Sequence, residues 1–391
     1  MANIYPLRAL RYTEKAGPLD NLATLPYDVI GPDLEADYRA RSPYNFVSLI
    51  LPHGDYDGAA ARLKAWREEG ILEQDSEEAL FVYEQTFPSP ADGVVLTRRG
   101  LIGLSDTEDY GRTIFRHERT LSGPKEDRFR LLEATRVQFD SIFMLFPDAG
   151  GAVESKLAAV CATPHDGHYT DQEKTLHKIW RITDPGWIAE IRALMAPKPL
   201  LIADGHHRYE TALRMGHPKT LMTFVSLESP GLRSFATHRI VHSVRDFSDA
   251  SFLEKLATAG SVRLAGRPEE FDQRPSGKMR FGVLLSSGYY EVEIPGAEKE
   301  LNVASLQERI LTPLLGITPE VAAAGTNLRY KRTLREAIAE VRERGAQIAF
   351  LLEDLPVEDV ARVSFGGVCL PQKSTFFYPK LGSGLVQYIL E

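Results

Sequence analysis

The chain has 391 residues, of which 43% are hydrophobic and 26% are charged, and its formal net charge is −8. This composition is ordinary for a globular protein and excludes extensive disorder. The length suffices for two or three domains whose cores need neither disulfides nor metals for stability. On average an acidic chain repels nucleic acid and anionic membranes, although a local basic pocket can still bind phosphate.

The two cysteines, Cys161 and Cys369, are far apart and belong to no motif. Free thiols are typical of a reducing compartment, so we expect a cytoplasmic protein. The first residues lack the blocks of a secretory signal, and no apolar run approaches the roughly 20 residues that cross a bilayer. We therefore expect small-molecule partners, with no nucleic acid and no membrane. A homo-oligomer is compatible with this composition.

The first region, residues 1–150, opens with an irregular stretch through Pro26–Val29. The apolar run Phe46–Leu51 predicts a buried strand, and Ala59–Gly70 has helical periodicity that ends at a glycine. Further strands are expected at 80–83, 94–97, 100–103 and 141–146, with a helix at 124–134. A glycine-rich stretch at 148–151 predicts a linker.

The second region, residues 151–250, alternates between helices and strands. The expected elements are helix Asp184–Met195, strand Pro199–Ala203, helix His206–Met215 and strand Thr220–Val225. This order is typical of a βαβ unit. The third region, residues 251–391, predicts a hairpin at 279–294, helices at 301–315 and 333–343, and a buried strand at 346–352. The chain is therefore expected to be mixed α/β (α+β), with β-rich regions on both sides of the βαβ core.

The most informative segment reads Ala-Asp-Gly-His-His-Arg-Tyr and starts at residue 203. Gly205 permits a tight turn between the strand and the helix, whose first N–H groups attract anions. His206, His207 and Arg208 add donors, and Arg208 can grip an anion with two N–H groups. Asp204 could cap the helix, coordinate a cation or accept a proton. An ordinary helix cap is the alternative, but burying so many polar groups without partners would cost several kcal/mol. The segment predicts a phosphate or carboxylate site.

Two further motifs carry charged or hydroxyl groups. In Arg-His-Glu-Arg-Thr, Glu118 is a candidate general base. Further along, Lys125 and Arg128 lie about one helical turn apart, so both could face one anion. A zinc protease is excluded because position 121 is leucine where a second histidine is needed. A solvated charged helix is the alternative.

Near the carboxyl terminus, Lys373, Ser374 and Thr375 offer an ammonium and two hydroxyls. They do not form a P-loop, since the required Gly-x-x-x-x-Gly pattern before the lysine is absent; the alternative is a turn before a strand. His238 and Arg239 follow the expected βαβ unit and are candidates for its pocket.

Together these motifs resemble domain-of-unknown-function family 1015, a group of bacterial and archaeal proteins. The matching segments are Pro26–Val29, His117–Glu118 with Pro124–Arg128, Ala203–Ala212, Thr237–Arg239 and Pro371–Lys380. The Asp-Gly-His-His-Arg core is also similar to the phosphate-binding motif of the ParB/sulfiredoxin superfamily, which includes free serine kinases. Sulfiredoxin chemistry needs a cysteine where this chain has His206, and the acidic balance argues against DNA partition.

The second resemblance implies a ParB/sulfiredoxin-like βαβ core that binds a nucleotide (ATP, ADP or CTP) and Mg²⁺. It implies a nucleotide-dependent phosphotransferase acting on a small hydroxyl metabolite, with free serine or a related amino acid as the expected substrate. The alternatives are a nucleotide-gated binding protein with little turnover and a phosphate-ester hydrolase.

The expected catalytic residues are Glu118, Asp204 and His207, with Asp204 as the Mg²⁺ ligand and Glu118 as the proton acceptor. Glu118 is assigned by its order in the chain and not by a matching motif. The residues expected to bind the nucleotide are Gly205, His206, Arg208, Tyr209, Lys125, Arg128, His238, Arg239, Lys373, Ser374 and Thr375.

Overall fold

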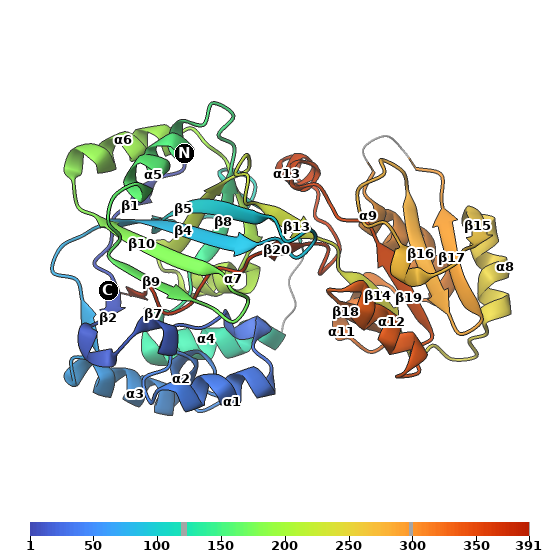
Figure 1. Ribbon diagram of the computed structural model, residues 1–391, viewed down its shortest axis with the longest axis horizontal. Helices are drawn as coiled ribbons and strands as arrows, with labels where there is room; N and C mark the ends of the chain where they lie inside the picture. The colour runs from blue at the N-terminus through green and yellow to red at the C-terminus, as the bar shows by residue number, and fades with distance from the viewer. Residues whose placement is uncertain (119–122, 297–299, 391) are drawn as a thin grey trace. The chain divides into compact units, whose positions relative to one another are not determined.

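The computed structural model describes residues 1–118, 123–296 and 300–390, without the side chains of residues 123–125 (Figure 1). The chain forms two compact units. Unit 1 comprises Met1–Arg116, Thr120–Leu232 and Pro379–Glu391, and unit 2 comprises His117–Arg119 and Arg233–Tyr378. The expected boundary at residue 150 falls inside unit 1, because strands from both sides of it share one sheet.

Unit 1 contains a nine-stranded mixed sheet in the order β6-β11-β8-β12-β5-β4-β10-β9, with β1 paired to β5. Its strands are β1 (Ile4–Tyr5), β4 (Leu80–Pro88), β5 (Val95–Asp106), β6 (Ile114–Arg116), β8 (Ile142–Phe146), β9 (Gly167–Thr170), β10 (Leu176–Ile182), β11 (Leu200–Asp204) and β12 (Lys219–Ser226). The β6–β11 and β8–β12 pairs are parallel and the other pairs are antiparallel. The mixed α/β class is therefore confirmed.

The strand–helix–strand order around residue 205 is present, with α7 at His206–Met215 between β11 and β12. However, β8 lies between these strands, antiparallel to β11 and parallel to β12. The two strands therefore run in opposite directions, unlike those of the expected βαβ unit. Local patterns predict that both strands exist, whereas pairing with the distant β8 sets their directions.

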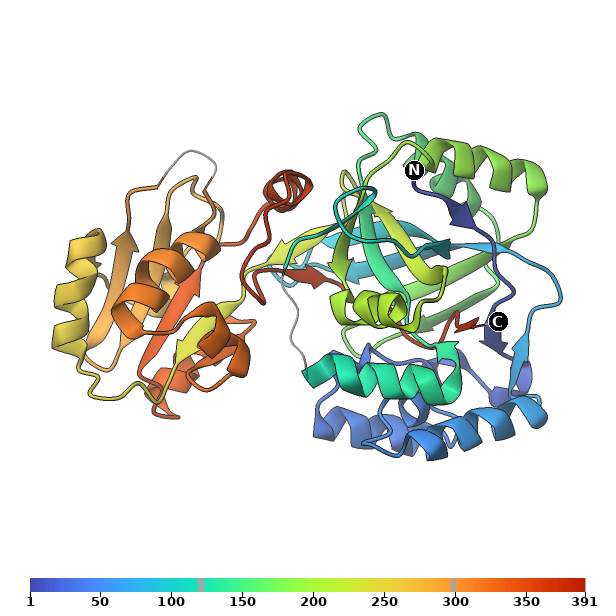
Figure 2. The same cartoon turned by 180° about the vertical axis from the view of Figure 1, so that it is seen from behind.

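Helices cover both sides of this sheet (Figures 1 and 2). Helices α5 (Ala152–Cys161) and α6 (Pro185–Met195) lie together on one side, and Leu157 and Ile191 pack into the sheet core. On the other side lie α1 (Pro32–Arg41), α2 (Val47–Ile50), α3 (Tyr56–Glu68) and α4 (Gly123–Thr135). Two small sheets, β2 (Leu10–Tyr12) with β3 (Leu72–Gln74) and β7 (Val137–Gln138) with β21 (Tyr388–Ile389), complete this part.

The expected strand at Phe46–Leu51 is wrong, because this segment contains helix α2. The Asn45 side chain accepts a hydrogen bond from Val47 N at 3.0 Å and donates one to Asn21 O at 2.7 Å. These bonds start a helical turn whose apolar side chains join the core formed with α3. A six-residue apolar run has no periodicity that distinguishes a strand from such a turn.

Unit 2 contains a six-stranded antiparallel sheet in the order β15-β17-β16-β19-β14-β18. The strands are β14 (His238–Val241), β15 (Ser261–Leu264), β16 (Arg280–Leu285), β17 (Gly288–Glu293), β18 (Leu328–Lys331) and β19 (Ile348–Leu352), and β13 (Arg233–Phe235) pairs separately with β20 (Phe376–Tyr378). The helices are α8 (Asp249–Ala259), α9 (Asn302–Leu306), α10 (Thr312–Leu315), α11 (Pro319–Ala324), α12 (Leu334–Arg342) and α13 (Val357–Phe365), with a π-helical turn at Gln307–Leu311. The expected hairpin, helices and buried strand of the third region are confirmed.

The strands of unit 2 alternate between two cores. Phe281 and Phe350 face one core, which includes Leu256 of α8, while Leu284 and Leu351 face the other, which is covered by α12. No helix in the described ranges combines the length and the apolar character needed to span a membrane.

Candidate functional site

The strand-to-helix turn at Gly205 shapes the main candidate site, which lies in unit 1. The β11 register shifts between Ile202 and Asp204, which redirects the end of the strand. Gly205 then adopts φ +92°, and a Cβ atom there would lie only 2.9 Å from Arg208 Cζ. Glycine is therefore required both by the backbone conformation and by the close approach of the arginine.

Asp204 is held between two cations. Its Oδ1 accepts a hydrogen bond from Lys380 Nζ at 2.8 Å and its Oδ2 accepts one from Arg208 Nη2 at 3.0 Å. Arg208 Nη1 also donates to the backbone oxygen of Ser141. Burial acts to lower the pKa of Arg208, but the carboxylates around it, led by Asp204, raise that pKa above its ordinary value. Arg208 therefore stays charged and fixes the Asp204 carboxylate against the start of β8.

The other residues at the start of α7 differ in exposure. His206 is buried and His207 is partly exposed. Tyr209 is fully buried, and its hydroxyl donates to Glu108 O at 2.6 Å and accepts from Glu108 N at 3.0 Å. Tyr209 thus anchors the helix to the loop after β5.

The turn at Tyr27–Val29, for which no function is expected from the sequence, lies in this part of unit 1. The Tyr27 ring stacks against the Arg128 guanidinium, with Cζ 4.0 Å from the ring centroid. Burial and the Asp28 charge raise the pKa of Tyr27, whereas Arg128 and Arg208 act to lower it. Arg128 itself donates to Asp127 Oδ2 at 2.8 and 2.5 Å and to Ile50 O at 2.9 Å. Arg128 and Arg208 are thus brought together, as a shared site requires.

Lys380 reaches Asp204 because the segment after Pro379 is anchored in unit 1. The buried Arg98 donates to Pro379 O at 2.6 Å, and Gln85 Nε2 donates to Lys380 O at 2.8 Å. Sequence reasoning gave Lys380 no role. Although Lys380 ends the matching segment Pro371–Lys380, that segment alone predicts no function for it, and its contact with Asp204 places it in the candidate site.

A second group of predicted residues lies in unit 2, where the His-Glu and Lys-Ser-Thr motifs meet. Glu118 Oε2 accepts from Lys373 N at 3.1 Å, and His117 Nε2 lies 2.8 Å from Thr375 Oγ1. The fully buried Ser374 donates to Pro371 O at 2.5 Å, which closes a local turn.

His238 and Arg239 belong to the same unit and are both buried. His238 Nδ1 accepts from Leu352 N at 3.2 Å, and burial lowers the pKa of His238 to about 4. Burial also lowers the pKa of Arg239 to about 10, opposed by Tyr330 and by Glu118. Arg239 Nη1 donates to Thr237 O at 2.5 Å. His238 is therefore neutral and joins neighbouring strands.

The predicted site residues thus fall into two groups. Unit 1 holds Asp204 to Tyr209 and Arg128, and unit 2 holds Glu118, His238, Arg239 and the Lys373–Thr375 turn. The side chain of Lys125 lies outside the described residues.

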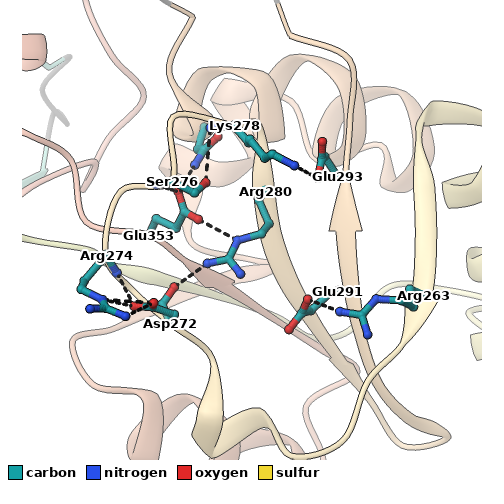
Figure 3. A network of polar contacts seen from close by, with 10 residues as sticks. Arg263, Asp272, Arg274, Ser276, Lys278, Arg280, Glu291, Glu293 and Glu353 are labelled. Atoms are coloured by element: carbon teal, nitrogen blue, oxygen red, sulfur yellow. Dashed lines mark hydrogen bonds and ion pairs between the residues drawn. The ribbon is translucent and has the colours of Figure 1, made fainter.

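A third polar cluster, on the sheet of unit 2, is paired within itself (Figure 3). Glu353, which is 2% exposed, accepts from Arg280 Nε at 2.7 Å and from Ser276 N and Oγ at 3.0 Å each. Arg280 Nη2 also donates to Asp272 O at 2.8 Å. These bonds attach the loop before β16 to the sheet, so we interpret the cluster as structural.

The sequence model of one family, described as "protein of unknown function (DUF1015)", matches residues 4–310. The chain belongs to the DUF1015 family. A comparison of this DUF1015 chain with curated proteins gives no match.

Solved structures show partial likeness to the DUF1015 chain. A conserved hypothetical protein from Pyrococcus furiosus has a TM-score of 0.40 and 13% identity over 70% of this chain and 91% of its own. A free serine kinase in complex with AMP has a TM-score of 0.44 and 12% identity over 74% and 91%. SbnI with a C-terminal truncation, from Staphylococcus aureus, has a TM-score of 0.39 and 11% identity over 73% and 86%.

Chemically, the unit 1 site of this DUF1015 chain combines a helix N-terminus with Arg208 and Lys380. These groups suit an anion with several oxygens, and phosphate is such an anion. Within the described ranges, no group of three or more His, Cys, Asp or Glu side chains is placed to hold a metal ion. Asp204 is the carboxylate nearest the helix N-terminus in sequence.

Proposed function

We propose that this protein is a nucleotide-dependent phosphotransferase that acts on a small hydroxyl metabolite, free serine or a related amino acid being the first to test. The observation that carries the proposal is the pairing of Asp204 with Arg208 and Lys380 at the start of α7. Phosphoryl transfer needs mainly positioning and cancellation of negative charge. Arg208, Lys380 and the positive end of the ten-residue helix α7 supply the positioning and the positive charge.

Mg²⁺ commonly binds one or two carboxylates and keeps several waters. Asp204 is the carboxylate of this site that would hold such an ion. When bound, the ion would neutralise charge on the nucleotide phosphates. Nucleotide affinity is therefore expected to rise with Mg²⁺.

The activity itself is tested by product formation. The purified protein is incubated with Mg²⁺, with ATP, ADP or CTP, and with a pool of hydroxy amino acids, and products are identified by mass spectrometry. A phosphorylated acid supports the proposal. Nucleotide binding without any product would instead indicate a nucleotide-gated binding protein, and release of phosphate from esters alone would indicate a hydrolase.

The phosphate site is tested by Arg208→Ala, with Arg214→Ala as the matched control on the same helix. Arg214 is half exposed and pairs with Glu126 at the surface. Loss of a charge-assisted contact costs about 1.5–3 kcal/mol, so Arg208→Ala should weaken nucleotide binding roughly tenfold or more. Calorimetric titration measures this. Equal affinities in the two variants would show that the nucleotide binds elsewhere.

The assignment of Glu118 as proton acceptor is a separate proposal, because Glu118 belongs to unit 2. Glu118→Gln keeps an oxygen that can accept the Lys373 N–H but cannot take a proton. Loss of general-base catalysis typically lowers turnover by about 10² to 10⁴. We expect such a loss in kcat with the nucleotide affinity kept, and unchanged turnover would remove Glu118 from the mechanism.

A further inference from the structure

A small cavity of about 50 Å³ lies in unit 1 between α4 and α7. Its polar lining includes Arg128, Arg208 and Asp140, and its apolar lining includes Leu132 and Phe139. One wall is therefore cationic and another is apolar. Because Arg208 also contacts Asp204, the cavity adjoins the proposed phosphate site.

The two arginines have capacity for a further acceptor. A guanidinium carries five N–H donors. The hydrogen bonds described above use three donors of Arg128 and two of Arg208. The planar donors that remain match the two oxygens of a carboxylate.

The rest of the cavity limits what can enter. Gln138 Oε1 already accepts from Leu221 N at 2.7 Å and Thr220 Oγ1 at 3.1 Å, so its position is fixed. Asp140 Oδ1 accepts from Ser383 Oγ. A group the size of a water molecule needs roughly 10–15 Å³ of cavity volume, so the cavity holds roughly three to five groups of this size. A nucleotide base is far too large.

We propose that this cavity binds the carboxylate end of a two- or three-carbon hydroxy or amino acid, the acceptor substrate of the proposed phosphotransferase. The carboxylate lies on Arg128 and Arg208, the short carbon chain lies against Leu132 and Phe139, and the ammonium of an amino acid faces Asp140. The hydroxyl group then points out toward Asp204. The role of the acid as acceptor substrate rests on the proposed function, whereas the binding of the acid in the cavity does not.

Binding is tested on the full chain with four probes, namely glycolate, L-serine, ethanolamine and inorganic phosphate, by calorimetric titration without nucleotide. Glycolate and L-serine should bind, and ethanolamine, which has no carboxylate, should not. Phosphate binding with no binding of glycolate or L-serine would overturn the proposal, since the arginines would then form a general anion site.

Variants locate the binding. Leu132→Phe fills the cavity and should weaken glycolate binding at least tenfold while leaving nucleotide affinity within about twofold. Arg128→Ala should weaken glycolate binding similarly. Arg130→Ala is the matched control, because Arg130 is an exposed residue of the same helix that pairs with Glu126. It should change neither affinity.

Thermal unfolding and nucleotide affinity show whether Leu132→Phe is folded. Undiminished glycolate binding in a folded Leu132→Phe protein overturns the proposal. The two proposals can fail separately. If glycolate or L-serine binds but no nucleotide binds, the proposed phosphotransferase function is refuted. If a nucleotide binds but neither acid binds, the proposed carboxylate site in the cavity is refuted.

Discussion

Asp354 and His238 in unit 2 have pKa shifts of opposite sign. Burial raises the pKa of Asp354 from 3.8 to about 6, although Ala236 N donates to it at 2.7 Å, and Glu353 adds to the increase. Burial lowers the pKa of His238 from 6.5 to about 4. Between pH 4 and 6, stability falls with rising pH because of Asp354 and rises because of His238. The two effects largely cancel in the wild type.

Asp354→Asn should therefore reveal the pH dependence of stability that His238 contributes. The substitution keeps an oxygen for Ala236 N and removes the carboxylate, whose shift of about two pKa units corresponds to about 3 kcal/mol. Relative to the wild type, the variant should become more stable as pH rises from 4 to 6. Chemical denaturation at several pH values measures this. Asp359→Asn is the control, at a half-exposed residue that pairs with Arg362. Parallel curves for all three proteins would contradict the assignment.

Sequence reasoning predicted a role for Asp204 and Arg208, since unusual polar residues gather there between an apolar strand and a helix. It could not identify Lys380, because its contact with Asp204 depends on a chain separation of 176 residues. It also treated Glu118 and Arg128 as one constellation. Ten residues separate them, yet the fold assigns them to different units.

At the scale of elements, the conformation of α7 depends on a glycine at each end. Gly205 has φ +92° with Arg208 against it, and Gly216 has φ +67° with nothing within 4 Å. Alanine in a left-handed conformation costs about 1–2 kcal/mol at either position. Only at Gly205 would the added methyl group also displace the arginine.

Gly205→Ala and Gly216→Ala thus form a matched pair. Both should lower the free energy of unfolding by about 1–2 kcal/mol. Gly205→Ala should in addition weaken nucleotide binding, whereas Gly216→Ala should not. Equilibrium unfolding measures the loss of stability, and calorimetric titration measures nucleotide affinity. Equal nucleotide affinities in the two variants would show that nucleotide binding does not depend on the present position of Arg208.

The sequence predicted β4, β5, β8, β11 and β12 in the unit 1 sheet and β16, β17 and β19 in the unit 2 sheet, because apolar runs and hairpin turns carry local signals. It did not predict the other strands of either sheet, such as β9, β10 and β14. It missed the helix α2, which depends on the Asn45 hydrogen bonds, and the opposed directions of β11 and β12, which depend on β8. In both cases a contact with a distant segment contributes, namely the bond from Asn45 to Asn21 O and the pairing with β8, and such contacts are not visible in a local pattern.

At the scale of the molecule, unit 1 is completed by the segment after Pro379. Leu381, Leu385, Val386 and Leu390 are all buried there. Burial of each such side chain contributes about 1.5–3 kcal/mol, and the sum is comparable with the whole stability of a domain.

Removing residues 379–391 should therefore unfold unit 1 and leave unit 2 folded. Hydrogen exchange should show lost protection in β11 and β12 and kept protection in β16 and β19, whose pairing lies within unit 2. Equal loss of protection in both sheets would show that the units do not unfold independently.

The separated segments of unit 1 also set an order of events during synthesis. The ribosome translates Asp204 and Arg208 well before residues 233–378, and Lys380 only after them. All nine strands of the large sheet are synthesised before residue 227, so unit 2 can fold on the nascent chain while unit 1 still lacks its carboxyl-terminal segment. A nascent chain without Lys380 lacks one cation of the phosphate site, so we expect the protein to gain full nucleotide affinity only once that segment has been released.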